Sequence, residues 1–375
     1  MARPAPRPRA CLVIALAVAA SATGLRAQEN WTYRARASAE STATRANGSR
    51  PPIAPPARGW DAAGLFLGSG DISWQRGERL RLAAGGSLSA TESAVDTVLR
   101  EAYARVGATS WMDLEAGKRL VRWSVGYGYS PTGVLDPPRT ATDPTDRLGQ
   151  NAGTWMARAD VFRGATSLTL PAAAPSGRPE VTKASDRLVA ARLRTIVGAG
   201  LEIALIGAAG EGSAPSYGGN VTHVIGQQLE WHGELLAHDR PDGTRTFSAA
   251  AGLQYTFAAG INVVVEYHRK GNGLNDAQWD AVMRGELDPG ATPSRRPFLF
   301  FRAAAAGAER RLAPELIVVA GVDDGGWTFV PAVTWAVGHQ VHLYARVTQL
   351  AGPRRSLVRS APWTTTVTAG GTVRF

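Results

Sequence analysis

The chain has 375 residues, a formal net charge of +10 and one cysteine. A single cysteine excludes a disulfide framework, and arginines that are scattered rather than clustered argue against nucleic acid as a partner, despite the basic isoelectric point. Beyond the first apolar run, no stretch approaches the roughly 18 uninterrupted apolar residues that a membrane-spanning helix needs.

Residues 1–27 have the order of a secretory signal peptide. Three arginines precede a short apolar run at 12–20, and small residues follow it, with candidate cleavage points after Ala22 and after Ala27. Cys11 lies before the apolar run, whereas a lipoprotein cysteine would follow it, so lipidation is not expected. We predict that the chain is exported and that the exported part contains no thiol.

The next segment differs in composition from the rest of the chain. Between Ser38 and Arg58 it is mostly Ala, Ser, Thr and Pro, with few large apolar side chains. Such a composition buries too little apolar area to offset the conformational entropy that is lost on ordering. We therefore predict a disordered periplasmic linker at 28–57, followed by one β-barrel domain at 58–375.

From Trp60 onward, apolar side chains recur at every second position, which is the period of a β-strand. In the last segment, one face carries the mostly apolar or small residues Trp363, Thr365, Val367, Ala369, Gly371, Val373 and Phe375. The opposite face carries threonines, a glycine and an arginine. Shorter stretches repeat the alternation at 111–116, 191–197, 229–238, 261–268 and 341–348.

Two architectures give strands one apolar and one polar face. A soluble sandwich buries the apolar face, whereas a membrane barrel turns it toward lipid. Segments of about ten residues, aromatic side chains at segment ends, and short links that alternate with long ones all favour the barrel. The sequence therefore predicts an all-β fold, a transmembrane antiparallel β-barrel with its polar residues facing the lumen.

The number of strands is predicted from the number of candidate segments and from the requirement that a barrel with both ends on one side of the membrane has an even number of strands. About 17 candidate segments can be marked. If the short links are periplasmic, both ends of the barrel lie in the periplasm and the number is even. We predict about 16 strands, with 14 and 18 left open. Within 98–106, Arg100 and Glu101 are adjacent, so both avoid lipid only if a β-bulge intervenes.

Alternation places a set of charged and imidazole side chains on the predicted lumen faces. They are Asp113, Glu115, Arg192, Arg194, Glu230, His232, Glu234, Glu266, His268 and Arg346. Histidines and carboxylates bind metals and act as general acids or bases. Large barrels ordinarily have polar interiors, however, so we favour a hydrated wall with no metal and no cofactor. The mixed signs of charge indicate no clear ion selectivity.

Motifs of enzymes are not found after residue 27. There is no G-x-S-x-G, H-E-x-x-H or P-loop pattern, and no serine in a recognisable nucleophile context. An enzyme that uses the histidines of the predicted lumen is the least favoured hypothesis, and no catalytic residue is predicted.

Two long links carry further candidates. The link at 130–151 is rich in proline and contains Asp136, Asp143, Asp146 and Arg147. A constriction folded into the lumen and a plain surface loop are equally good interpretations of it. The link at 270–296 has the composition of a short helix, which we expect to decorate the surface rather than to form a lid.

The terminal stretch 364–375 resembles the C-terminal signature of bacterial outer-membrane barrels, in which a final phenylalanine is read by the barrel assembly machinery. A weaker likeness to porin-like, mostly uncharacterised outer-membrane families covers 99–103, 117–123, 130–132, 143–147, 266–267 and 271–273. This resemblance implies a barrel of about 16 strands and a transport role. It implies no catalytic residue.

The sequence thus predicts a porin-like channel of the outer membrane for passive or substrate-preferring passage of small hydrophilic solutes. The expected partners are the lipid bilayer, the barrel assembly machinery, through the strand that ends at Phe375, and the solutes themselves. The alternative is a plugged barrel with a structural or binding role.

Overall fold

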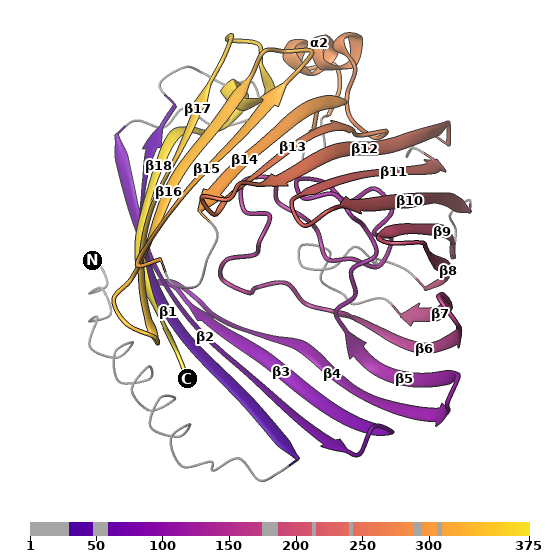
Figure 1. The fold of residues 1–375 in the computed structure, drawn as a ribbon. Coiled ribbons are helices and arrows are strands. Elements are labelled where there is room, and N and C mark those ends of the chain that lie inside the picture. Colours follow the sequence, from indigo (N-terminus) through magenta and orange to yellow (C-terminus); the bar gives the residue numbers. More distant parts are fainter. Residues whose placement is uncertain are drawn as a thin grey trace.

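The computed structural model describes residues 30–47, 59–174, 187–211, 215–239, 243–288, 294–305 and 310–375. Within these ranges, 18 strands form one antiparallel sheet that closes on itself between the first and last strands (Figure 1). The strands are β1 (Trp31–Ala46), β2 (Trp60–Arg76), β3 (Leu80–Ala90), β4 (Val95–Thr109), β5 (Met112–Arg119), β6 (Thr154–Arg163), β7 (Thr166–Ala174), β8 (Leu188–Val197), β9 (Leu201–Gly210), β10 (Ser216–Ile225), β11 (Leu229–Asp239), β12 (Arg245–Thr256), β13 (Ile261–Arg269), β14 (Pro297–Ala305), β15 (Leu312–Gly321), β16 (Trp327–Ala336), β17 (Val341–Ala351) and β18 (Trp363–Arg374).

The predicted fold class is confirmed, with 18 strands in place of about 16. The predicted linker is wrong over Trp31–Ala46, which form β1 between β2 and β18. Small residues gave this stretch the composition of a linker, but a closing barrel offers hydrogen-bond partners on both of its edges. Residues 48–57 and the predicted signal peptide lie outside the described residues.

The apolar faces of the strands point outward, as predicted. On β11, the outward Leu235 is 50% exposed, whereas its neighbour Glu234 is 5% exposed. Exposed aromatic side chains border this apolar surface near both ends of the barrel. Near the short links they are Trp31, Trp111, Phe162, Phe257 and Trp335, and near the long links they are Trp60, Trp155, Tyr217, Phe247 and Trp327. Two aromatic girdles around an apolar band are typical of barrels that span a membrane.

The β-bulge that would allow both Arg100 and Glu101 to avoid lipid is present. The register between β3 and β4 shifts at Gly85 and Gly86, opposite Arg100. Because of this extra residue, both charged neighbours lie inside: Arg100 Nη1 is 3.8 Å from Asp71 Oδ1, and Glu101 Oε1 accepts a 2.7 Å hydrogen bond from Arg119.

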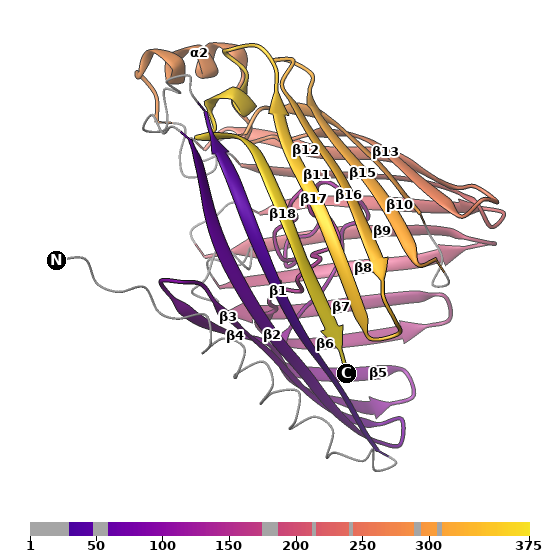
Figure 2. The same ribbon diagram turned by 90° about the vertical axis from the view of Figure 1, so that its left-hand side faces the viewer.

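Both ends of the sheet meet at the end of the barrel that carries the short links. Ala35 N donates to the carbonyl oxygen of Phe375 at 3.2 Å, and Phe375 N donates to that of Ala35 at 2.9 Å. The strand number is therefore even, as the parity argument required. Figure 2 shows the helix α2 (Asp276–Arg284), which lies in the link between β13 and β14, at the opposite end of the barrel from the C-terminus.

The helix predicted within 270–296 is present as α2. Asn275 caps it by accepting a 2.8 Å hydrogen bond from Gln278 N. Trp279 and Val282 are buried, and Trp279 Nε1 donates to the carbonyl oxygen of Arg355 at 2.5 Å. The helix therefore packs against the link between β17 and β18, near the 3-10 helix η1 (Leu357–Ser360). Neither helix is long and apolar enough to cross a membrane.

Gly117 lies on β5 at a point where this strand approaches the backbone of β4 closely. Its φ is +131°, and a Cβ there would lie 2.1 Å from the carbonyl oxygen of Ala102 and 2.6 Å from Tyr103 Cα. We expect Gly117→Ala to destabilise the barrel by about 2–4 kcal/mol, from backbone strain and overpacking. The measurement is the temperature at which the protein loses its heat-modifiable gel mobility. We expect this temperature to be lower for the variant than for the parent. Gly64→Ala is the control, because an added Cβ there meets nothing within 4 Å. Equal midpoint temperatures for the two variants would contradict the prediction.

Candidate functional site

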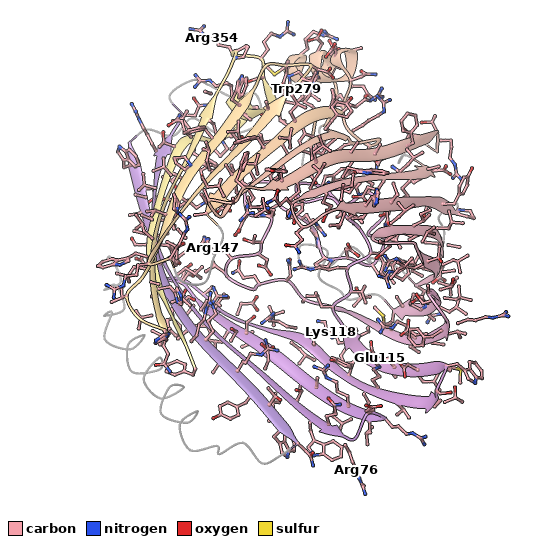
Figure 3. The ribbon with its side chains drawn as sticks, viewed as in Figure 1. Arg76, Glu115, Lys118, Arg147, Trp279 and Arg354 are labelled. Carbon is pink, nitrogen blue, oxygen red and sulfur yellow. The ribbon has the colours of Figure 1, made fainter. Side chains whose placement is uncertain are left out.

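The link between β5 and β6 turns into the barrel and follows its inner wall (Figures 1 and 3). We call this segment, residues 120–153, the belt. It is longer than the predicted loop at 130–151, because β5 ends already at Arg119. The interpretation of this loop as one folded into the lumen is the one that the structure supports, and the surface-loop alternative is wrong.

Glu234 of β11 binds the first part of the belt. Its carboxylate accepts hydrogen bonds from Ser124 Oγ at 2.6 Å, from Gly126 N at 2.9 Å and from Thr132 N at 3.1 Å, and also from the Thr132 hydroxyl. The glutamate is buried, so these hydrogen bonds are shielded from water. A charged acceptor in such a place makes strong hydrogen bonds and is costly to remove.

Glu266 of β13 binds the adjacent stretch in the same way. Its two oxygens accept hydrogen bonds from Tyr127 N at 2.6 Å and Gly128 N at 2.8 Å. His232 Nε2 lies 2.8 Å from Oε1, and His268 Nε2 lies 2.9 Å from Oε2. All three wall side chains are fully buried. This cluster is therefore a dry attachment point for the belt, and neither a hydrated wall nor an acid–base site that a solute can reach.

The belt also packs on apolar side chains of the inner wall. Val121, Trp123 and Leu135 form a buried cluster with Met156, Ala173 and Ile206 of β6, β7 and β9. Tyr127 and Ala141 pack against a second cluster, made of Val264, Phe300, Ile317 and Val330 of β13 to β16. The expectation of a hydrated polar wall is therefore wrong where these two clusters lie. Strand alternation shows which side chains point inward, but not that a folded segment covers them.

The later part of the belt reaches the opposite side of the barrel. Arg147 Nη1 donates to Glu40 Oε2 of β1 at 2.9 Å, and its guanidinium lies 4.8 Å from the centre of the Tyr344 ring of β17. Arg36 of β1 donates to the Arg147 carbonyl oxygen. Figure 3 shows Arg147 at this wall, across the interior from Glu115 and Lys118.

Two further contacts complete the course of the belt. Arg346 of β17 donates to the Thr142 carbonyl oxygen and lies 3.9 Å from the Asp143 carboxylate, where burial raises the pKa of the carboxyl group. Arg100 of β4 donates to the Asn151 carbonyl oxygen at 3.4 Å. The belt thus contacts the wall from β6 through β16, then β17 and β1, and finally β4.

A polar cavity of about 200 Å³ lies inside the belt. All of its lining residues belong to the belt: Arg122, Asp136, Pro137, Pro138, Arg139, Thr140, Asp143, Pro144, Asp146, Gln150 and Asn151. Arg139 is turned to the belt backbone, where it donates to the carbonyl oxygens of Gly126 and Ser124. Arg122 is exposed and has no carboxylate within ion-pair distance among the described residues.

Comparisons with known proteins bear on the fold. No family model and no curated protein matches the sequence. Solved structures do: OccK11 (OpdR) of Pseudomonas aeruginosa aligns with a TM-score of 0.58 at 14% identity, and OccAB1 of Acinetobacter baumannii with 0.59 at 11%. Each alignment covers 92% of this chain and 96% of the other. A porin of Rh. blastica aligns with a TM-score of 0.50 at 9% identity, over 92% and 100%. The chain has the fold of the outer-membrane porins.

Within this porin fold, the four residues predicted for a constriction have different tasks. Asp136 accepts from Trp123 N at 2.7 Å and stabilises the belt itself. Asp146, at φ 48°, accepts from the backbone N–H groups of residues 150 and 151. Asp143 and Arg147 bind the wall. Asp136, Asp143 and Asp146 nevertheless line the same cavity inside the belt, whereas Arg147 does not. No group of three or more His, Asp or Glu side chains in the described ranges could hold a metal.

The remaining predicted lumen residues of the porin barrel lie in local charge pairs. Asp113 pairs with an arginine of β4, and Glu115 lies 3.5 Å from arginines of β5 and β6. Arg192 and Arg194 both pair with a glutamate of β9, at 3.2 and 2.5 Å. Glu230 Oε1 lies 3.3 Å from a histidine Nδ1 on its own strand. Each of these side chains therefore has a charged or imidazole partner, although Arg192 and Arg194 share a single glutamate.

Sequence reasoning missed several residues of this site. Glu40 fell within the predicted linker, and Arg122 fell in a stretch that alternates like a strand. Asn220 of β10 donates to the Trp123 carbonyl oxygen at 2.8 Å, yet it lies in no charged pattern. The proline-rich composition of 130–151 marked the region, but no local signal identifies which wall residues bind it.

Proposed function

We propose that this protein is an outer-membrane channel for passive, substrate-preferring passage of small hydrophilic solutes. One observation carries the proposal: the belt surrounds a polar cavity within a barrel whose outer face is apolar. The basic and apolar order of residues 1–27 supports export, and the alternation that ends at Phe375 supports recognition by the barrel assembly machinery. No step of the proposal needs a cofactor or a catalytic residue.

A second cavity supports the channel and indicates its charge preference. It has a volume of about 320 Å³ and is lined by β1 to β5. Four arginines and two acidic residues line it: Arg34, Arg81, Arg100, Arg119, Asp71 and Glu101. Arg100 pairs with Asp71, and Arg119 pairs with Glu101. Arg34 and Arg81 have no carboxylate within ion-pair distance among the described residues. Unpaired cations in a narrow aqueous space favour anions over cations.

Conductance tests this proposal. Purified protein added to a planar bilayer is expected to produce discrete conductance steps, and a salt gradient is expected to give a reversal potential on the anion-selective side. Protein that has been heat-denatured is the control. Folded protein that inserts, as shown by its heat-modifiable mobility, but gives no conductance would contradict the proposal.

The plugged barrel remains the second candidate function, because one observation favours it. The belt is bound to both sides of the barrel, by Glu234 and Glu266 on one side and by Glu40 and Arg346 on the other. Insertion without conductance is the result expected for that role.

A further inference from the structure

We propose that solutes pass through the ring formed by the belt alone, and that Arg122 is the side chain that determines charge preference there. This inference rests on the proposed channel function and names the residues at its narrowest point. It differs from the sequence-based expectation, in which wall residues of the strands line the passage.

The course of the belt supports a ring. From β5 the belt runs along β6 to β13, where Asn220, Glu234 and Glu266 bind it. It continues past the apolar cluster of β13 to β16, then meets Arg346 of β17 and Glu40 of β1. It returns to β4 and β6, where Gly153 N donates to the Arg100 carbonyl oxygen at 2.8 Å. The 200 Å³ cavity is therefore enclosed by one segment.

The space behind the ring is dry over most of the wall. Ala173 and Val330 are buried in the two apolar clusters, and Glu266 with its two histidines is fully covered. Buried apolar side chains are packed without room for water, so hydrophilic solutes have no path there. Among the described residues, passage behind the belt along β10 to β16 is therefore excluded. A cavity of about 690 Å³ at β6 to β9 is lined by Met156 and Ala173 but also by outward residues such as Val189, which is 59% exposed, so it opens at the outer face.

The wall of β1 to β5 is the alternative path, because the 320 Å³ cavity lies there. The belt meets this wall through Arg36, Glu40 and Arg100, which bond to belt residues. These contacts cover the wall above the cavity. We infer that the 320 Å³ cavity is a vestibule below the ring, and that it opens into the ring.

Among the described residues, one charged side chain that lines the ring has neither a hydrogen-bond nor an ion-pair partner. Asp136 and Asp146 accept hydrogen bonds from the belt backbone, and Asp143 is paired with arginines. Arg139 donates to belt carbonyl oxygens. Arg122 alone has its guanidinium exposed in the cavity without a carboxylate partner among the described residues, with the side chain of Gln150 on the same lining.

Single cysteines test the path in a Cys11→Ser background, which contains no other thiol. A methanethiosulfonate reagent with a trimethylammonium group is added at Gln150→Cys in the ring, Ser73→Cys in the vestibule and Val330→Cys behind the belt, where the side chain is fully buried. We expect modification at Gln150 to lower single-channel conductance by more than half. Modification at Ser73 is expected to lower it by much less, and the cysteine at position 330 is expected to resist labelling. Asn151→Cys is the second ring site if Gln150→Cys does not fold.

Two results would overturn the ring. One is labelling at Gln150 with unchanged conductance, and the other is a stronger block from Ser73 or from Val330 than from Gln150. Labelling is followed by mass in the folded protein, so the accessibility of the three sites is tested even if no variant conducts. Absence of conductance in the unmodified parent would count against the channel function itself. The labelling of the three cysteines would then show by itself whether the belt encloses a water-filled ring.

The role of Arg122 is tested by charge reversal. Arg122→Glu is expected to move the reversal potential in a salt gradient toward the cation-selective side, by more than Arg81→Glu in the vestibule does. The narrowest part of a pore dominates its selectivity, so the site with the larger shift marks the constriction. An equal or larger shift for Arg81→Glu would place the selective point in the vestibule and would contradict the proposal.

Discussion

Glu234→Ala is expected to release the belt and to produce the largest functional change of any single substitution in the barrel. The substitution leaves the backbone N–H groups of Gly126 and Thr132 and two belt hydroxyls without their acceptor. Each buried polar group without a partner costs about 1–3 kcal/mol. The strands keep their own hydrogen bonds, so the barrel is expected to survive while the belt loosens.

Single-channel recording of Glu234→Ala should therefore show a conductance several-fold above that of the parent, with greater current noise. The matched control is Glu315→Ala, which removes a partly exposed interior carboxylate that pairs with Arg302 and binds no belt residue in the described chain. If Glu234→Ala conducts like the parent, with the same noise, the belt does not limit passage. A rise of the same size in Glu315→Ala would indicate a general effect of lost charge.

Val367→Arg is expected to prevent stable insertion. Val367 lies on the outer face of β18, opposite Ala43 of β1 and Val347 of β17. An arginine on the lipid-facing side near the bilayer midplane costs about 2–4 kcal/mol. We expect the variant to lose most of its heat-modifiable fraction when it is refolded into lipid vesicles.

Thr366→Arg is the matched control for this second prediction. It places the same side chain one position away, on the inner face opposite Thr44 and Thr348. The control is expected to insert with near-parental yield, because an interior arginine stays solvated or paired. Equal yields of Val367→Arg and Thr366→Arg would show that the two faces of β18 are not distinguished by lipid.

The features that were predictable from the sequence are those set by neighbouring residues. Alternation along each strand identified the outward and inward faces, and the adjacent charges Arg100 and Glu101 required a bulge that is present. β1 was missed because its outward positions are small: Ala35, Ala37 and Ala39 read as a linker. What orders such a strand is its pairing with β2 and β18, and a local pattern does not contain that pairing.

The candidate site was predictable only in part. Inward orientation of Glu234 and Glu266 followed from alternation, but their partners lie 110 and 139 residues away in sequence. Whether an inward carboxylate faces water or a folded segment depends on these distant contacts. For this reason, side chains that were expected on a hydrated wall turn out to bind the belt, while Arg122 inside the ring carried no signal of its own.

The outer face of the barrel is expected to meet lipid and the inner face to meet water. A fluorescent probe on single cysteines in the Cys11→Ser background, in vesicles, tests this expectation most directly. Leu205 points outward and is 60% exposed. We predict that spin-labelled lipids quench the fluorescence of a probe on Leu205→Cys and that iodide does not. On Ser73→Cys, which lines the vestibule, iodide alone is predicted to quench. Quenching of both probes by iodide, or of the Ser73 probe by the lipids, would contradict the account.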